Sequence, residues 1–179
     1  MKKLTGIVAF VCIVALFFSN NLQAQTFPKL DKSPMDAATF PSDYKNANKF
    51  IKVIYSRPQL KNRTIEQLAP AGKVWRTGAN EAPEITFYKD TNFGDKLIKA
   101  GTYSLFTIPG EEAWTVIINK DLNTWGAYYY NEANDVARVK APVKMADESV
   151  EAFSISFDEK GTMHMGWGNL RLAVPTATK

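Results

Sequence analysis

The sequence predicts an all-β protein, a single antiparallel β-sandwich of the jelly-roll-like kind. Two observations support this class. Short runs rich in β-branched and aromatic residues recur along the chain and are separated by Gly, Pro, Asn and Asp, and hardly any segment shows the 3.6-residue period of a helix. Parallel sheets need crossover connections of a dozen or more residues, usually helices, and no run here is long enough to supply them.

The predicted sandwich domain spans residues 50–175 and begins with a strand over residues 49–55, KFIKVIY. We expect this strand to end before Pro58, because proline cannot donate a ladder hydrogen bond. Residues 62–68 predict a short helical turn, which Pro70 and Gly72 end.

The later strands are bounded by turn residues, and residues 90–95 are themselves expected to form a turn. The predicted strands cover residues 84–89, 96–99, 102–108, 113–119, 125–129, 136–140, 150–157 and 162–174. Alternation in the run AWTVIIN should place Trp114, Val116 and Ile118 on one face. The same rule predicts an inward row of Phe153, Ile155 and Phe157, followed by a hairpin turn at 158–161.

The N-terminus is expected to be a secretory signal peptide, residues 1–24. Lys2 and Lys3 precede an apolar run over residues 4–18, and a small-residue site ends at Ala24. The run is shorter than the roughly 20 residues that a membrane-spanning helix needs. We therefore predict a periplasmic or secreted protein that does not remain inserted in the membrane after cleavage; a retained anchor is the alternative.

Cleavage would remove Cys12, the only cysteine, so we expect neither a disulfide nor thiol chemistry in the mature chain. The remaining length suits one domain that is stabilised by its own core. Residues 25–49 contain three prolines and no sustained period, which predicts an extended arm that leads into the domain.

The net charge is modest, with 22 Lys and Arg against 18 Asp and Glu. Such a balance argues against a nucleic-acid partner. The positive charge is concentrated in one segment, where five cations accompany a single acid, Glu66: Arg57, Lys61, Arg63, Lys73 and Arg76. A solvated face is the ordinary meaning of such a segment, and a binding site is the alternative.

Several kinds of chemistry lack the residues that they require. His164 is the only histidine, so the sequence predicts no metal and no cofactor site, and no serine triad. No glycine-rich phosphate loop is present. The paired acids lie at predicted turns, where a solvated charge is the simpler interpretation than a two-carboxylate hydrolase site.

The remaining candidates for a functional site are cationic and aromatic. We predict a ligand-binding site built from six residues: Arg57, Lys73, Arg76, Asn80, Trp125 and Tyr128. An arginine fork suits a carboxylate or phosphate, and exposed rings stack on flat sugar faces, so the expected ligand is a small anionic or carbohydrate molecule.

The stretch GKVWRTGAN, residues 72–80, carries two readings. Strand alternation places Trp75 and Arg76 on opposite sides, so the ring is expected in the core. In the plainer reading Arg76 pairs with Glu81 or Glu84, and such an exposed ion pair contributes little. In the functional reading Arg76 faces a pocket. Trp114 is assigned to the core, Trp167 to the core or to a binding platform, and Trp125 to the surface.

Long blocks of the chain resemble one bacterial family, the domain of unknown function 2911. They include SPMD, IYSRPQLKNR, GKVWRTGANEAPEITF and AGTYSLFTIPGEEAWTVIINKDLNTWGAY, extended by DVARVKAP and EAFSISFD. The resemblance covers nearly the whole mature chain. The resemblance implies an exported β-rich protein. It does not imply any particular catalytic activity.

Three hypotheses for the function follow. The leading one is a non-enzymatic binding or structural module with an anionic or sugar-like ligand. The second is a metal-independent enzyme that uses Arg, Lys, Tyr or carboxylate groups in the same pocket. The third is a scaffold for partners in the cell envelope.

Overall fold

The computed structural model describes residues 25–178, and the predicted signal peptide lies outside these residues. The described residues fall into two units, of which the first includes residues 25–30 and the second begins at Asp31. In the first unit, residues 25–30 form no regular secondary structure and their side chains are exposed. The second unit contains every element described below. No helix within residues 25–178 has the length and apolar character needed to cross a bilayer.

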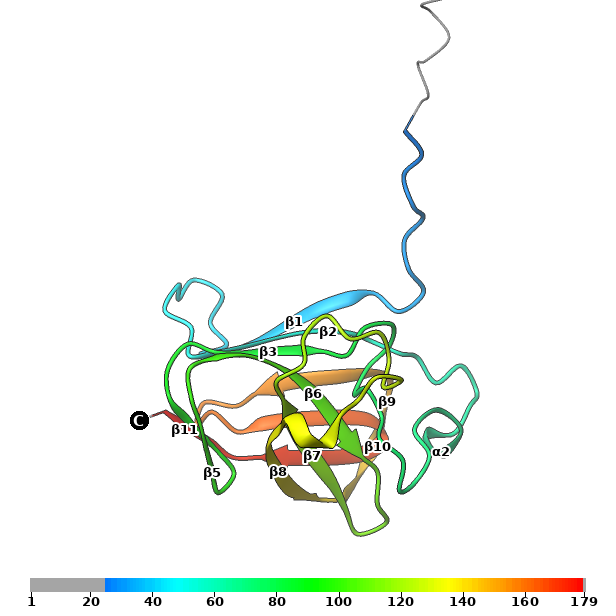
Figure 1. The fold of residues 1–179 in the computed structure, drawn as a ribbon. Coiled ribbons are helices and arrows are strands. Elements are labelled where there is room, and N and C mark those ends of the chain that lie inside the picture. The colour runs from blue at the N-terminus through cyan, green and yellow to red at the C-terminus, as the bar shows by residue number, and fades with distance from the viewer. Residues whose placement is uncertain (1–24, 179) are drawn as a thin grey trace, which may run out of the picture. The chain divides into compact units, whose positions relative to one another are not determined.

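The largest layer is a six-stranded antiparallel sheet in the order β1-β2-β3-β6-β7-β8 (Figure 1). Its strands are β1 (Met35–Phe40), β2 (Ile51–Ser56), β3 (Glu84–Phe87), β6 (Gly101–Ile108), β7 (Ala113–Asn119) and β8 (Asp135–Pro142). The pairing of β6 with β7 matches Leu105 to Ile118, which aligns the apolar alternation of the two strands.

The second layer is a long antiparallel hairpin of β9 (Lys144–Phe157) and β10 (Met163–Val174). A three-stranded sheet in the order β11-β4-β5 accompanies it, with β4 (Thr91–Phe93), β5 (Lys96–Ile98) and β11 (Thr176–Thr178). The antiparallel all-β class predicted from the sequence is confirmed.

One continuous core joins the two layers. Its inward side chains come from the six-stranded sheet, from β9 and β10, and from Phe93 and Ile98 of the small sheet. Trp75 lies at its centre: its ring stacks on Trp167 at 5.2 Å and meets Phe153 and Trp114 edge-on at 5.3 and 6.0 Å. The predicted inward positions of Trp75 and Trp114 are therefore confirmed. Trp167 belongs to the core rather than to a platform, because it is only 1% exposed.

Tyr55 joins the two layers through its hydroxyl group. The hydroxyl donates to the carbonyl of Ile155 at 3.3 Å and accepts from the amide of Ile155 at 2.9 Å. Burial raises the pKa of Tyr55 above its ordinary value. A tyrosine on β2 thus fixes the position of β9 against the six-stranded sheet.

The short helical turn predicted near residue 65 is confirmed as α2 (Ile65–Leu68). Thr64 begins it with a capping box, in which its hydroxyl accepts from the Gln67 amide and the Gln67 side chain accepts from the Thr64 amide. The hairpin turn at 158–161 is also confirmed, since the Gly161 amide donates to the Asp158 carbonyl.

Five strand assignments differ from the sequence prediction, and one of them is β9, which begins at Lys144 instead of residue 150. β1 lies inside the stretch expected to be an extended arm, and β4 occupies part of the predicted turn at 90–95. β11 follows the last predicted strand. Residues 125–129 form turns instead of a strand, with only an isolated bridge at Trp125. β1 and β11 are short strands at a sheet edge, and such strands are selected by their partner strand more than by local propensity.

Candidate functional site

The candidate site lies on the outer face of the six-stranded sheet, the face turned away from β9 and β10. A small apolar cluster of Ala82, Phe106 and Ile117 is buried there, apart from the main core. Ala127 and Tyr130 of the connection between β7 and β8, residues 120–134, pack on this cluster, and the ring of Tyr130 lies 5.1 Å from that of Phe106. Because this connection packs on the outer face of the sheet, its residues Trp125 and Tyr128 lie beside the sheet.

Asn119, fully buried at the end of β7, fixes both ends of this connection. Its side-chain oxygen accepts from the Asp121 amide at 2.9 Å. Its side-chain nitrogen donates to the Asn131 carbonyl at 3.0 Å and to Asp135 Oδ1 at 2.8 Å. A buried amide with all these partners favours one conformation of the loop.

A second set of contacts holds the far end of the connection. The hydroxyl of Tyr130 donates to Asp135 Oδ2 at 2.6 Å and accepts from Arg138 Nη2 at 2.8 Å. Arg138 also pairs with Asp135 and with Glu132, at 2.7 and 3.1 Å. Burial, together with the bond to Asp135, raises the pKa of Tyr130 to about 12, so its hydroxyl stays protonated and can donate.

The middle of the connection pairs with residues 80–82, just before β3. The Gly126 amide donates to the Asn80 carbonyl at 3.0 Å, and the Ala82 amide donates to the Thr124 carbonyl at 2.9 Å. Between them, Glu81 and Trp125 form an antiparallel bridge. Two segments more than 40 positions apart in the sequence are thereby brought side by side.

Gly126 is the point where three predicted site residues meet. Besides its bond to Asn80, a Cβ atom on this glycine would lie 2.8 Å from the ring of Tyr128 and 3.5 Å from Nη1 of Arg76. Its φ of +65° also favours glycine. The absent side chain thus leaves room for a guanidinium and a ring to lie within a few ångströms of one position.

The partners of Arg76 distinguish the two sequence readings. No ion pair or hydrogen bond joins Arg76 to Glu81, to Glu84 or to any other residue in 25–178, so the plainer reading is wrong. Its Nε is buried and has no hydrogen-bond partner. Glu84 instead accepts from the Asn123 amide at 3.2 Å. Arg76 therefore keeps an uncompensated positive charge.

The backbone next to Arg76 is strained. Thr77 has a φ of +56° although it is β-branched and fully buried. Left-handed backbone at a β-branched residue is a genuine outlier, and such outliers cluster at functional sites. The Thr77 hydroxyl donates to Thr107 Oγ1 at 3.2 Å, which holds the strained residue against β6.

The remaining predicted site residues have different surroundings. Asn80 takes a φ of +60°, which asparagine tolerates, and Trp125 and Tyr128 are 55% and 77% exposed. Arg57 bonds to the Phe153 carbonyl, to Ser154 Oγ and to Asp36, which links β9 with the strands β1 and β2. Lys73 is exposed in the turn after Pro70. The contacts join Arg76, Asn80, Trp125 and Tyr128 through Gly126, whereas Arg57 and Lys73 have separate contacts.

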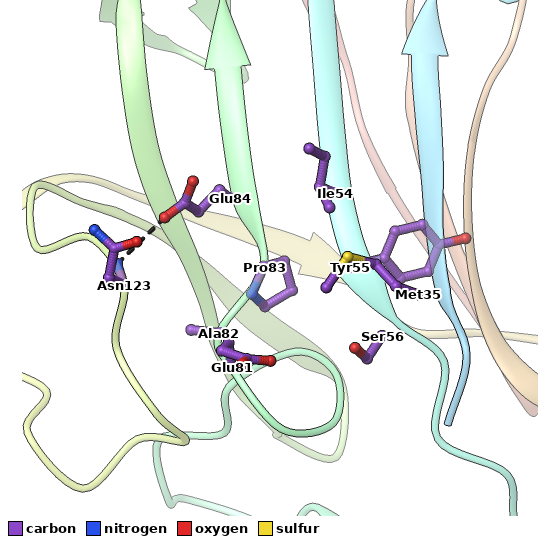
Figure 2. A pocket seen from close by; sticks show the side chains of 9 residues that line it. All are labelled: Met35, Ile54, Tyr55, Ser56, Glu81, Ala82, Pro83, Glu84 and Asn123. Atoms are coloured by element: carbon purple, nitrogen blue, oxygen red, sulfur yellow. Dashed lines mark hydrogen bonds between the residues drawn. The ribbon is translucent and has the colours of Figure 1, made fainter. Parts of the chain in front are cut away.

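A cavity of about 250 Å³ lies on the same face and was not predicted (Figure 2). Glu81, Glu84 and Asn123 line one side of it, and Met35 and Ile54 belong to the other. Glu81 belongs to the bridge with Trp125, so the cavity adjoins the Arg76 site. In the sequence, the one hint of this cavity is Asn123, because asparagine is a typical turn residue. In the structure Asn123 takes a φ of +56°.

His164 lies apart from the Arg76 site, on β10, where its Nε2 is 3.0 Å from Asp158 Oδ2. The bond to His164, followed by amide bonds from the turn, lowers the pKa of Asp158 to about 2. Within residues 25–178, no three His, Cys, Asp or Glu side chains come close enough together to hold a metal ion.

Comparison with known proteins places the chain in a family. A family model described as "Protein of unknown function (DUF2911)" matches residues 33–176. No curated protein and no solved structure matches the chain. Because the match spans the whole sandwich, from β1 into β11, the chain belongs to the DUF2911 family.

Proposed function

We propose that this protein is an exported, non-enzymatic binding module that holds an anionic, sugar-like ligand on the outer face of its larger sheet. Arg76 grips the anionic group, the rings of Trp125 and Tyr128 contact the flat face of the sugar, and Asn80 positions the turn beside them. The proposal depends mainly on one observation: Arg76 lies beside Gly126 and the Tyr128 ring, and no described carboxylate pairs with it.

The chemistry of the group supports an oxyanion. A guanidinium presents planar N–H donors that match a carboxylate or phosphate in two-point contact. A half-buried guanidinium without a counter-ion is unfavourable in the free protein, so an anion that supplies the missing acceptor gains in binding.

The neighbouring rings support the sugar-like part. Trp125 and Tyr128 are largely exposed although the loop that carries them is fixed by Asn119 and by the Tyr130–Asp135–Arg138 contacts. Rings that are held by a fixed loop lose little conformational freedom on binding. Sugar rings present apolar C–H faces to such surfaces, with hydroxyl groups at the edge.

The test uses D-glucuronate as the anionic sugar and D-glucose as its uncharged counterpart, each titrated by nuclear magnetic resonance. We expect amide shifts at Arg76, Asn80 and 125–128 with glucuronate and much smaller ones with glucose. Arg76→Ala should weaken glucuronate binding by about tenfold or more, because a charge-assisted hydrogen bond contributes about 1.5–3 kcal/mol. Tyr128→Ala should also weaken glucuronate binding, because the ring that contacts the sugar face is lost.

Lys73→Ala is the matched control, since it removes one positive charge from an exposed position that has separate contacts. An equal loss of affinity in Lys73→Ala and Arg76→Ala, or no response to glucuronate at all, would contradict the proposed site. Conversion of the sugar during the titration would instead favour the enzyme hypothesis. Export is tested separately, by sequencing the mature N-terminus, which we expect at Gln25.

A further inference from the structure

A second hollow lies between β8 and β10, and its lining is basic. It has a volume of about 360 Å³, and four basic side chains line it: Lys140, Lys144, His164 and Arg171. Its other lining residues are apolar, among them Leu172 and Pro142, and no acid is among them. The cavity near the Arg76 site contains Glu81 and Glu84 and no cation. A cavity beside α2 contains Glu66 and Glu111, again without a cation.

Strand alternation explains how the basic groups gather. Lys140 lies between the core residues Val139 and Ala141, so its side chain points away from the core. His164 lies between Met163 and Met165, and Arg171 precedes Leu172, all of which are core residues. Lys144 begins β9 directly after the turn from β8. Because β8 and β10 pack against each other, their outward cations share one hollow.

Arg171 supplies a fixed charge. Its Nη1 donates to the carbonyls of Gly168 and Leu170 at 2.8 and 2.9 Å, and its Nη2 donates to the Glu148 carbonyl at 2.6 Å. Its stem lies over Gly166, where a Cβ atom would be 3.4 Å from Cδ of the arginine. Carbonyl partners hold the guanidinium in place and leave its net charge uncompensated.

Lys140 and Lys144 supply two further positive charges in the hollow. Neither ammonium group forms an ion pair or hydrogen bond with any residue in 25–178. Asp158 contacts His164 on this wall, with its Oδ2 3.0 Å from the histidine Nε2. A cleft lined by charges of one sign concentrates the electrostatic potential and attracts counter-ions.

We infer that the hollow between β8 and β10 is a second binding site, which takes a small, multiply charged oxyanion between Lys140, Lys144 and Arg171. The volume is within the range of small-molecule sites, about 300–1,000 Å³, and exceeds what a single oxyanion group fills. Lysine ammonium groups bind phosphate or carboxylate oxygens as point charges, so a ligand with two or three such groups fits the site. The inference is independent of the Arg76 site.

The experiment titrates the protein with pyrophosphate and, in a second arm, with citrate, at low ionic strength, and follows backbone amide shifts. We expect shifts at residues 140–144, 164 and 171–173. The double variant Lys140→Ala/Lys144→Ala should bind at least about tenfold more weakly, since two charged hydrogen-bond donors are lost. Tighter binding of pyrophosphate would identify phosphate groups as the preferred chemistry, and tighter binding of citrate would identify carboxylates.

The matched control is Lys52→Ala/Lys120→Ala, which removes the same charge from lysines that lie outside the hollow and also lack side-chain partners within residues 25–178. It should change the affinity by less than about twofold, and Arg76→Ala should leave it unchanged. If the control loses as much affinity as Lys140→Ala/Lys144→Ala, the binding reflects net charge alone and the site is refuted. Absence of binding by either anion would refute it as well.

Discussion

Trp75 and Arg76 are neighbours in the sequence, yet they belong to opposite faces of the larger sheet and have opposite kinds of surroundings. Trp75 is 6% exposed and touches three other aromatic rings in the main core. Arg76 faces the outer cluster, where its Nε has no partner. The inner face encloses its ring among other apolar side chains, whereas the outer face leaves a charge and two rings available.

Stability and binding are thus separated by two adjacent residues of one extended segment, which pairs with β6 only through the isolated bridge of Trp75 and Thr107. Substitutions on the inner face remove close-packed apolar contacts, and this loss lowers the free energy of unfolding strongly. Outer-face changes act on a loop that is held at its ends and exposed at its centre. The variants below test this separation, from the largest expected effect to the smallest.

Trp75→Ala should cause the largest loss of stability. The ring fills the space between Trp114, Phe153 and Trp167, so its removal leaves a cavity in the core. We expect the free energy of unfolding to fall by about 3–5 kcal/mol in urea denaturation. Arg76→Ala should cost far less, and an equal cost for both variants would show that the two faces are not separable.

Tyr55→Phe should lower the free energy of unfolding by about 1–3 kcal/mol, because the buried Ile155 amide loses its acceptor. Tyr103→Phe is the control. The Tyr103 hydroxyl donates to the Lys99 carbonyl at 3.1 Å in an exposed setting where water can replace it. Similar losses in the two variants would mean that Tyr55 does not join the layers.

Gly126→Ala and Gly72→Ala form a matched pair. Both glycines have positive φ, +65° and +72°, so both substitutions add backbone strain of about 1 kcal/mol. A Cβ at Gly72 meets nothing within 4 Å, whereas one at Gly126 meets the Tyr128 ring. Thermal denaturation should show similar stability losses, and only Gly126→Ala should shift the ring resonances of Tyr128 and weaken glucuronate binding. An unchanged Tyr128 spectrum in Gly126→Ala would contradict the described packing.

The smallest effect is expected from the exposed pair of Asp158 and His164, which lies apart from both faces of the comparison. The pKa of Asp158 is about 2 in the folded protein, below the value of about 3.9 in an unfolded chain. Its contribution is therefore present above about pH 4 and is lost as the pH falls towards 2. His164→Ala should flatten this decline in melting temperature between pH 4 and 2. A decline identical to that of the wild type would show that the turn amides alone lower the pKa.

Local pattern predicted most of the fold, and the residues show why. Alternation in AWTVIIN placed Trp114, Val116 and Ile118 in the core, and the row Phe153, Ile155 and Phe157 faces the same core. Residues 125–129 read as a strand because they are aromatic. They form turns instead: the rings of Trp125, Tyr128 and Tyr129 remain exposed, and the stretch pairs only through the isolated bridge of Trp125 and Glu81.

The sequence by itself determined the all-β class, the family, the inward direction of Trp75 and the outward direction of Arg76, because alternation along a strand is a local property of the chain. Only the tertiary structure decided which outward residues meet. Gly126 lies against Arg76 because the loop after β7 closes over residues 80–82, and Lys140 shares a hollow with Arg171 because β8 packs beside β10. Contacts of this kind depend on loop closure and on packing between segments that are distant in the sequence, so no local pattern predicts them.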